Sequence, residues 1–128
     1  MRLLLDTHIA LWAVTDSPRL PVPARALILD ASNEVWVSAA SVWEIAIKHA
    51  LGRTAMPVTG TEALHWFSVS GYRDLPITSR HTAAVDELPP IHSDPFDRLL
   101  AAQANTEPLR LVTRDKTLAR YSELAILV

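Results

Sequence analysis

Short apolar blocks recur along this chain, and three of them have the length and composition of buried strands. "RLLLD" at residues 2–6, "EVWVS" at 34–38 and "LRLVT" at 109–113 are mainly apolar runs, as in the interior of parallel sheets. Two fainter candidates are "DLPI" at 74–77, which Pro76 weakens, and "AILV" at 125–128. The pattern predicts a sheet of about five strands.

Helical periodicity occupies the segments between the strands, over residues 9–14, 23–30, 40–51, 62–68, 82–88, 95–105 and 116–121. Proline and glycine interrupt it at 15–23, 52–60 and 88–95, but none of these breaks is long enough to separate two domains. Strands that alternate with helices predict an α/β fold, with a mostly parallel sheet covered by helices on both faces. We expect a single domain over residues 1–128.

Two aspartates stand where strands of this sheet are expected to end. Asp6 directly follows the strand at its start, and Asp115 comes two residues after the strand at 109–113. Ligands of α/β proteins bind near the carboxyl ends of the strands, so both are candidate site residues. The alternative for each is a structural role, as the N-cap of the helix that follows.

Glu44 is a third candidate, because it lies in a helix that is otherwise strongly apolar. It shares a narrow polar stripe with Ser41 and Lys48. The alternative is a solvated pair between Glu44 and Lys48, four residues apart, which stabilises a helix by a few tenths of a kcal/mol.

Asp97, in "HSDPFDRLLAAQA", is the fourth candidate. It heads the stripe of Leu100, Ala101 and Ala104, which is the helix face expected to pack inward. A carboxylate on a packed face needs a partner. The alternative is a capping box, in which Asp94 is the N-cap and Asp97 occupies the third helical position.

A divalent cation would explain all four acids together, because several carboxylates in close approach repel one another unless a cation neutralises them. Oxygen ligands, with no cysteine and no HxxxH pair in the sequence, favour Mg²⁺ or Mn²⁺ over zinc. His8 and His92 are candidates to line the same pocket. His49, His65 and His81 are interpreted as ordinary helix or surface residues.

Composition narrows the class of protein. The 128 residues are 49% hydrophobic, and the absence of cysteine excludes disulfides, thiolate zinc sites and cysteine nucleophiles. No apolar run suggests a membrane span or a signal peptide, so a cytoplasmic protein is expected. The net charge of -2 does not favour nucleic-acid binding, but without the four acids ten acidic residues remain against twelve Lys and Arg. No GxSxG, P-loop or GxGxxG motif occurs.

Four segments together resemble the VapC-type PIN-domain ribonuclease toxins of toxin–antitoxin systems: "LLLDTHIALW", "SAASVWEIAIKHALGR", "LPPIHSDPFDRLLAAQA" and "LRLVTRDKTLARY". The resemblance spans almost the whole chain, and it implies a three-layer α/β/α fold. It implies that Asp6, Glu44, Asp97 and Asp115 are catalytic and hold Mg²⁺ or Mn²⁺. Thr7 and Thr113 would support them, and Asp94 would cap a helix. An RNA substrate, a small VapB-like antitoxin and a homodimer are implied as well.

Other readings of individual residues and of the whole chain stay open. Lys48, Arg98, Arg114 and Lys116 are candidates to bind substrate phosphates, with solvated surface charge as the alternative. Trp12, Trp43, Trp66 and Phe67 are candidates for an apolar groove that receives a partner helix, with core packing as the alternative. A Mg²⁺-binding receiver-like signalling domain would account for Asp6 and Lys116 but not for acids on helices. A catalytically silent PIN interaction module is the other rival.

Overall fold

Five parallel strands form one sheet in the order β3-β2-β1-β4-β5 in the computed structural model, which describes residues 1–53 and 56–128. The strands are β1 (Arg2–Leu5), β2 (Glu34–Ser38), β3 (Arg73–Leu75), β4 (Arg110–Thr113) and β5 (Ile126–Leu127). All four neighbouring pairs run parallel. The predicted α/β fold with a mostly parallel sheet is therefore confirmed.

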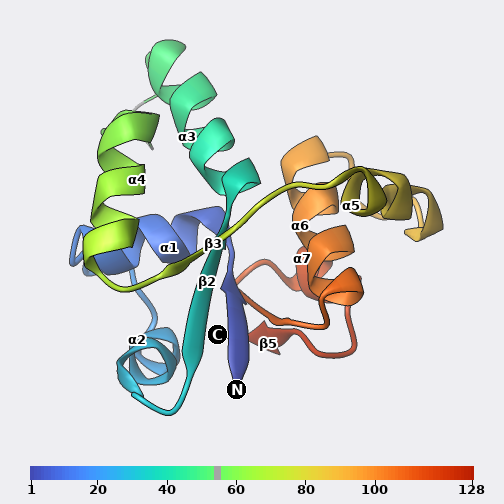
Figure 1. Ribbon diagram of the computed structural model, residues 1–128, viewed down its shortest axis with the longest axis horizontal. Coiled ribbons are helices and arrows are strands. Elements are labelled where there is room, and N and C mark those ends of the chain that lie inside the picture. The colour runs from blue at the N-terminus through green and yellow to red at the C-terminus, as the bar shows by residue number, and fades with distance from the viewer. Residues whose placement is uncertain (54–55) are drawn as a thin grey trace.

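Helices flank the sheet on both sides (Figure 1). They are α1 (Thr7–Val14), α2 (Val22–Leu29), α3 (Ala39–Ala50), α4 (Gly60–Val69), α5 (Ser79–Ala84), α6 (Pro95–Thr106) and α7 (Lys116–Ala119), with a 3₁₀ turn, η1, at Val85–Glu87. In the view of Figure 1, α2 and α4 lie to the left of the sheet, and α5, α6 and α7 lie to its right. None of the helices in the described ranges is long and apolar enough to cross a membrane.

The central strand β1 supplies residues to the core on both of its faces. Leu3 and Leu5 belong to one apolar cluster, with residues of α1, α2 and α4, whereas Leu4 belongs to a second cluster with α6 and α7. This division follows from the alternation of side chains along a strand. Because both faces of β1 are buried, the strand is apolar at consecutive positions, and the sheet forms the middle layer between two layers of helices.

Several element boundaries differ from the sequence prediction because of capping. Helix α1 begins at Thr7 rather than at residue 9, since Asp6 is its N-cap. Helix α5 begins at Ser79 rather than at residue 82, since Thr78 and His81 form a reciprocal capping box. Thr54 and Ala55, inside the break predicted at 52–60, lie outside the described residues.

Helix α4 begins at Gly60, inside that same predicted break, and it packs closely on α3. A Cβ atom at Gly60 would lie 2.8 Å from the Cβ of Ala46, so the absence of a side chain permits the contact. Strand β3 ends at Leu75 because Pro76 has no N–H for a further sheet hydrogen bond.

The strand order reverses direction between β1 and β4. The chain adds β2 and β3 on one side of β1 and then crosses to place β4 and β5 on the other side. In open α/β sheets the crevice beyond the carboxyl ends of the strands at such a switch point is where ligands bind. Leu5 pairs with Val112, so Asp6 and Thr113 emerge side by side at this crevice.

Candidate functional site

A pocket of about 460 Å³ lies at the switch point and contains all four predicted acids. Its lining residues are Asp6, His8, Trp12, Arg19, Glu44, Lys48, Asp94, Asp97, Arg114 and Asp115. They come from α1, α3, the start of α6 and the turn after β4, with Arg19 from the segment between α1 and α2. Five carboxylates face three Lys and Arg side chains there, so the pocket is acidic.

Asp6 has both a structural contact and a place in the pocket. Its Oδ1 accepts a hydrogen bond from the N–H of His8 at 3.3 Å, which caps α1, and its Oδ2 accepts one from Thr113 Oγ1 at 2.6 Å. Burial raises the pKa of Asp6 although both hydrogen bonds favour the ionised form. The second hydroxyl expected near the site, that of Thr7, instead lies 2.8 Å from Ser41 Oγ and links α1 to α3.

Asp94 and Asp115 each cap a helix with one oxygen. Asp94 Oδ1 accepts from the N–H groups of Phe96 and Asp97 at the start of α6. Asp115 Oδ1 accepts from Thr117 and Leu118 at 2.8 and 3.2 Å. Helix N-termini favour nearby negative charge, which offsets part of the repulsion among the acids.

The pKa of Asp115 reflects these contacts. Burial by itself raises the pKa of Asp115, but the N–H groups of Leu118 and Thr117 outweigh it and, with His92, leave the pKa below its ordinary value. Asp115 therefore stays ionised, and its Oδ2 remains directed away from the helix it caps.

Glu44 is not a solvated surface acid. It is only 2% exposed, and its Oε2 forms an ion pair with Lys48 Nζ. The alternative of a Glu44–Lys48 pair is therefore correct in its partners, but the expectation that solvent surrounds Glu44 is wrong. Its other oxygen, Oε1, is buried without a hydrogen-bond partner. A buried carboxylate oxygen without a partner is costly, so this atom favours a cation in the pocket.

Asp97 is not part of a capping box. The N–H of Asp94, which a capping box would direct to Asp97, instead donates to Nδ1 of His92 at 3.2 Å. Asp97 Oδ2 lies 3.1 Å from His92 Nε2. Burial raises the pKa of Asp97 from 3.8 to about 7, and the charges of Asp6, Asp94 and Glu44 add to the increase while His92 opposes it.

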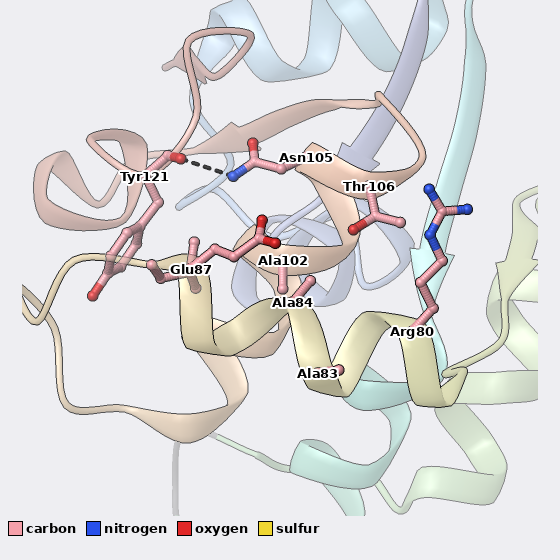
Figure 2. Close-up of a pocket in the computed structure, with 9 residues that line it drawn as sticks. Arg80, Ala83, Ala84, Glu87, Ala102, Asn105, Thr106 and Tyr121 are labelled. Carbon is pink, nitrogen blue, oxygen red and sulfur yellow. Dashed lines mark hydrogen bonds between the residues drawn. The ribbon is translucent and has the colours of Figure 1, made fainter.

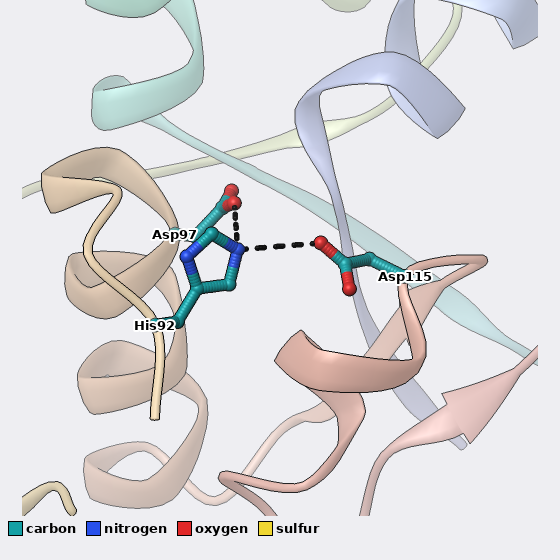
Figure 3. Close-up of side chains that lie close together, drawn as sticks. All are labelled: His92, Asp97 and Asp115. Atoms are coloured by element: carbon teal, nitrogen blue, oxygen red, sulfur yellow. Dashed lines mark hydrogen bonds and ion pairs between the residues drawn. The ribbon is translucent and has the colours of Figure 1, made fainter. Parts of the chain in front are cut away.

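His92 connects two of the acids (Figure 3). Its Nε2 lies 3.1 Å from Asp97 Oδ2 and 3.3 Å from Asp115 Oδ2. One potential ligand atom from each of the three residues falls within 4.8 Å of the others. The sequence suggested His92 only as a candidate pocket residue, because nothing in its spacing shows which atoms it contacts.

The basic residues considered as candidates for phosphate binding fall into two groups. Lys48 and Arg114 line the pocket, whereas Lys116 does not. Arg98 also points elsewhere, because its guanidinium donates to the carbonyls of Val85, Pro89 and His92. Arg19 also lines the pocket, but the sequence analysis did not name it. It lies in a proline-rich segment without the hydrophobic periodicity that would show which way a side chain points.

The aromatic residues do not form the single exposed groove considered above. Phe67 is buried and Trp66 packs against the core, so the core-packing alternative is correct for both. Trp12 lines the acidic pocket, with the Arg114 guanidinium 5.7 Å from its ring centroid. Trp43 is 56% exposed and contacts Phe96 edge-on, with 5.1 Å between ring centroids.

His81 differs from its interpretation as an ordinary helix or surface residue, because it is buried at 1% exposure in α5. Its Nδ1 accepts from the N–H of Thr78, and its Nε2 pairs with Glu107. The first contact caps α5 itself, and the second joins α5 to the end of α6, away from the acidic pocket.

A second pocket, of about 550 Å³, lies between α5, η1, α6 and the residues after α7 (Figure 2). Asn105 spans part of it and donates to the carbonyl of Tyr121 at 3.0 Å. Glu87 is the one acid among its lining residues, which otherwise include Arg80 and small side chains. It offers a metal ion no group of carboxylates, so the acidic pocket is the better candidate for chemistry.

The donors of the acidic pocket suit a divalent cation. Asp6, Glu44, Asp97 and Asp115 could hold it with hard carboxylate oxygens, the ligands that Mg²⁺ and Mn²⁺ prefer. The unpartnered Oε1 of Glu44 and the raised pKa of Asp97 both reflect negative charge crowded into this pocket, which a divalent cation would neutralise.

Comparison with known proteins agrees with this geometry. The family model described as PIN domain matches residues 3–124. The chain belongs to the PIN-domain family. Among curated proteins, this PIN domain is 33% identical over 123 residues to ribonuclease VapC22 of Mycobacterium tuberculosis, covering 92% of this chain and 90% of that protein. The predicted resemblance to VapC-type PIN domains is confirmed.

Two solved structures share the fold of this PIN domain. VapBC2 from Rickettsia felis, solved bound to a DNA fragment from its promoter, has a TM-score of 0.70 and 19% identity, covering 100% of this chain and 98% of that chain. VapBC-1 from nontypeable Haemophilus influenzae has a TM-score of 0.62 and 16% identity, covering 94% and 92%. Both similarities support the three-layer PIN-like architecture.

Proposed function

We propose that this PIN domain is a metal-dependent endoribonuclease that hydrolyses RNA phosphodiester bonds, with Mg²⁺ or Mn²⁺ held by Asp6, Glu44, Asp97 and Asp115. The observation that carries the proposal is the meeting of these four carboxylates in one pocket at the switch point of the sheet, where Glu44 Oε1 has no partner. Its relative VapC22 is a ribonuclease by name, which supports RNA as the substrate class.

A bound divalent cation would neutralise charge on the phosphate and activate water for attack. Other residues of the chain orient the carboxylates that would hold it. Thr113 holds one oxygen of Asp6, and the start of α7 holds one oxygen of Asp115, so both carboxylates keep a fixed direction. Arg114 and Arg19, at the same pocket, are placed to bind substrate phosphates.

The family and the site together argue against the first rival. A receiver-like domain does not require a glutamate from α3, and here Glu44 is buried in the same pocket as the strand-end aspartates. The second rival, a silent PIN module, would cleave no RNA even when a cation is bound.

We also propose that the protein is the cytoplasmic toxin of a toxin–antitoxin pair, restrained by a small VapB-like antitoxin. The support is its relation to VapC22 and its fold, which it shares with chains from two VapBC structures. A homodimer remains a prediction from the family resemblance.

The decisive experiment incubates the purified protein with a structured RNA in Mg²⁺, in Mn²⁺ or in EDTA. We expect cleavage with either cation and none in EDTA. Asp97→Asn should reduce cleavage to background, whereas Asp86→Asn, which alters an exposed acid in η1, should cleave normally. Full activity in EDTA would contradict the metal mechanism. Cation binding without cleavage of any RNA would support the silent module.

Co-expression with the small open reading frame next to the gene tests the toxin role. We expect the protein alone to arrest growth and the small partner to copurify and relieve the arrest. If the overproduced protein is harmless and no partner copurifies, the toxin role is wrong even when the nuclease activity is present.

A further inference from the structure

His92 is more firmly held than its position in a loop suggests. The residue lies between η1 and α6, in a segment that contains Pro89 and Pro90. Its carbonyl accepts hydrogen bonds from Arg98 Nη1 and from Tyr121 Oη, both at 3.3 Å. Arg98 also donates to Tyr121 Oη at 3.2 Å, so the two anchors support each other. The backbone of His92 is thereby tied to α6 and to the residues after α7.

The ring of His92 is fixed as well, and its tautomer follows from its partners. Nδ1 lies 3.2 Å from the backbone nitrogen of Asp94, which can only donate a hydrogen bond. Nδ1 is therefore the acceptor, and the proton of the neutral ring is on Nε2. That N–H donates to Asp115 Oδ2 at 3.3 Å, and Asp97 Oδ2 lies 3.1 Å from the same nitrogen (Figure 3).

The spacing of the three residues alone would also permit His92 to be a metal ligand, since their ligand atoms lie within 4.8 Å. Ligation by Nε2 requires a free lone pair on that nitrogen, and the proton would have to move to Nδ1. It would then face the N–H of Asp94, and two donors would oppose each other. The hydrogen bonds of the ring thus favour a donor role over a ligand role.

We propose that His92 is a positioning residue of the metal site: its Nε2–H, which donates to Asp115 Oδ2 and lies beside Asp97 Oδ2, keeps the two carboxylates in place, and its nitrogen does not bind the metal. The inference rests on the proposed function. Asp115 is already held at Oδ1 by the start of α7, and His92 constrains its other oxygen. Asp97 has no such backbone contact in the described residues, and its Oδ2 lies 3.1 Å from the same His92 nitrogen.

Removing an outer partner of a metal ligand typically weakens metal binding by about 10- to 100-fold. We therefore expect His92→Leu to raise the Kd for Mn²⁺ by about that factor, measured by calorimetry on the full chain. His92→Gln should recover most of the affinity, because its side-chain amide offers an N–H near the position of Nε2 and an oxygen toward Asp94. His65→Leu, at an exposed position on α4, is the matched control and should leave the Kd unchanged.

Pulsed EPR of the wild-type protein loaded with Mn²⁺ gives an independent readout. We expect no directly coordinated ¹⁴N from His92. A nitrogen coupling in the wild type that disappears in His92→Gln would make His92 a ligand and overturn the proposal. An unchanged Kd in a folded His92→Leu, checked by circular dichroism, would also overturn it.

The EPR result on the wild type decides between ligand and donor even when the leucine variant does not fold. A wild-type protein that neither binds Mn²⁺ nor cleaves RNA would remove the proposed function, and this inference with it. A wild type that does both, with His92→Leu indistinguishable from it, would remove this inference alone.

Discussion

Replacing Asp97 with asparagine should stabilise the metal-free protein at pH 8, although it abolishes the proposed activity. The carboxylate lies at a buried position near Asp6, Asp94 and Glu44, and these surroundings raise its pKa to about 7. The folded state therefore holds a proton on Asp97 more tightly than the unfolded state does. Ionisation of this group opposes folding, and asparagine removes the charge while keeping the shape.

The size of the effect follows from linkage. A rise from 3.8 to about 7 corresponds to about 4 kcal/mol of lost stability once both states are ionised. The side chain is 17% exposed, and solvent screening reduces the figure to about 2 kcal/mol. Losing an acid at the start of α6 costs about 0.3 to 1 kcal/mol through the helix dipole. The expected net gain is about 1 to 2 kcal/mol at pH 8.

The pH dependence gives the sharper test. Below pH 3.8 Asp97 is protonated in both states and has no effect, and its destabilisation grows as the pH rises to about 7. At pH 5 the folded protein holds Asp97 protonated and only about a third of the full effect is present, so the gain from Asp97→Asn should be well below its value at pH 8. Urea unfolding in EDTA at pH 5 and pH 8, followed by tryptophan fluorescence, measures both differences.

Asp86→Asn is the control, because an exposed acid should change the free energy of unfolding by less than about 0.5 kcal/mol at either pH. The reasoning is refuted when Asp97→Asn is less stable than the wild type at pH 8. An equal gain at pH 5 and pH 8 would refute it too, since the effect would not arise from ionisation.

Two further substitutions test the contacts of the site. Lys48→Met should destabilise the metal-free protein by about 2 to 3 kcal/mol, because it leaves Glu44 buried without its partner. Saturating Mg²⁺ should recover much of the lost stability, and thermal melts with and without the cation measure both effects. Thr113→Val removes the hydrogen bond that the hydroxyl donates to Asp6 and the one that it accepts from the N–H of Asp115. It should cost about 1.5 to 3 kcal/mol in urea unfolding at pH 8 and weaken Mn²⁺ binding by about 10-fold in calorimetry. A Thr113→Ser variant that fails to restore both values would contradict the role of the hydroxyl.

Much of the fold could be predicted from the sequence because each inner strand is a short apolar run that belongs in the centre of a parallel sheet. The edge strands were less clear: β3 has three residues and β5 has two, too few for a pattern. The starts of α1 and α5 were missed for a different reason. These helices begin directly after their polar N-cap residues, Asp6 and Thr78, and a search for hydrophobic periodicity does not detect polar caps.

The acids of the site were predictable, because the end of a strand and the face of a helix can both be derived from residue order. Their contacts were not. The polar stripe of α3 looks solvated when the helix is considered alone, and only the packing of α3 beside α1 and α6 buries Glu44. The link from His92 to Asp115 joins residues 23 positions apart and leaves no local signal in the sequence.

The hydrogen bond between Thr113 and Asp6 joins residues 107 positions apart, and it has a consequence for synthesis of the chain. A ribosome makes Asp6 107 residues before Thr113, so a growing chain that lacks β4 has an open edge on β1 and no completed pocket. If the protein cleaves RNA as proposed, the unfinished chain cannot attack the message from which it is being translated. The order of the strands thereby delays the enzyme until β4 and the turn that carries Asp115 have been made.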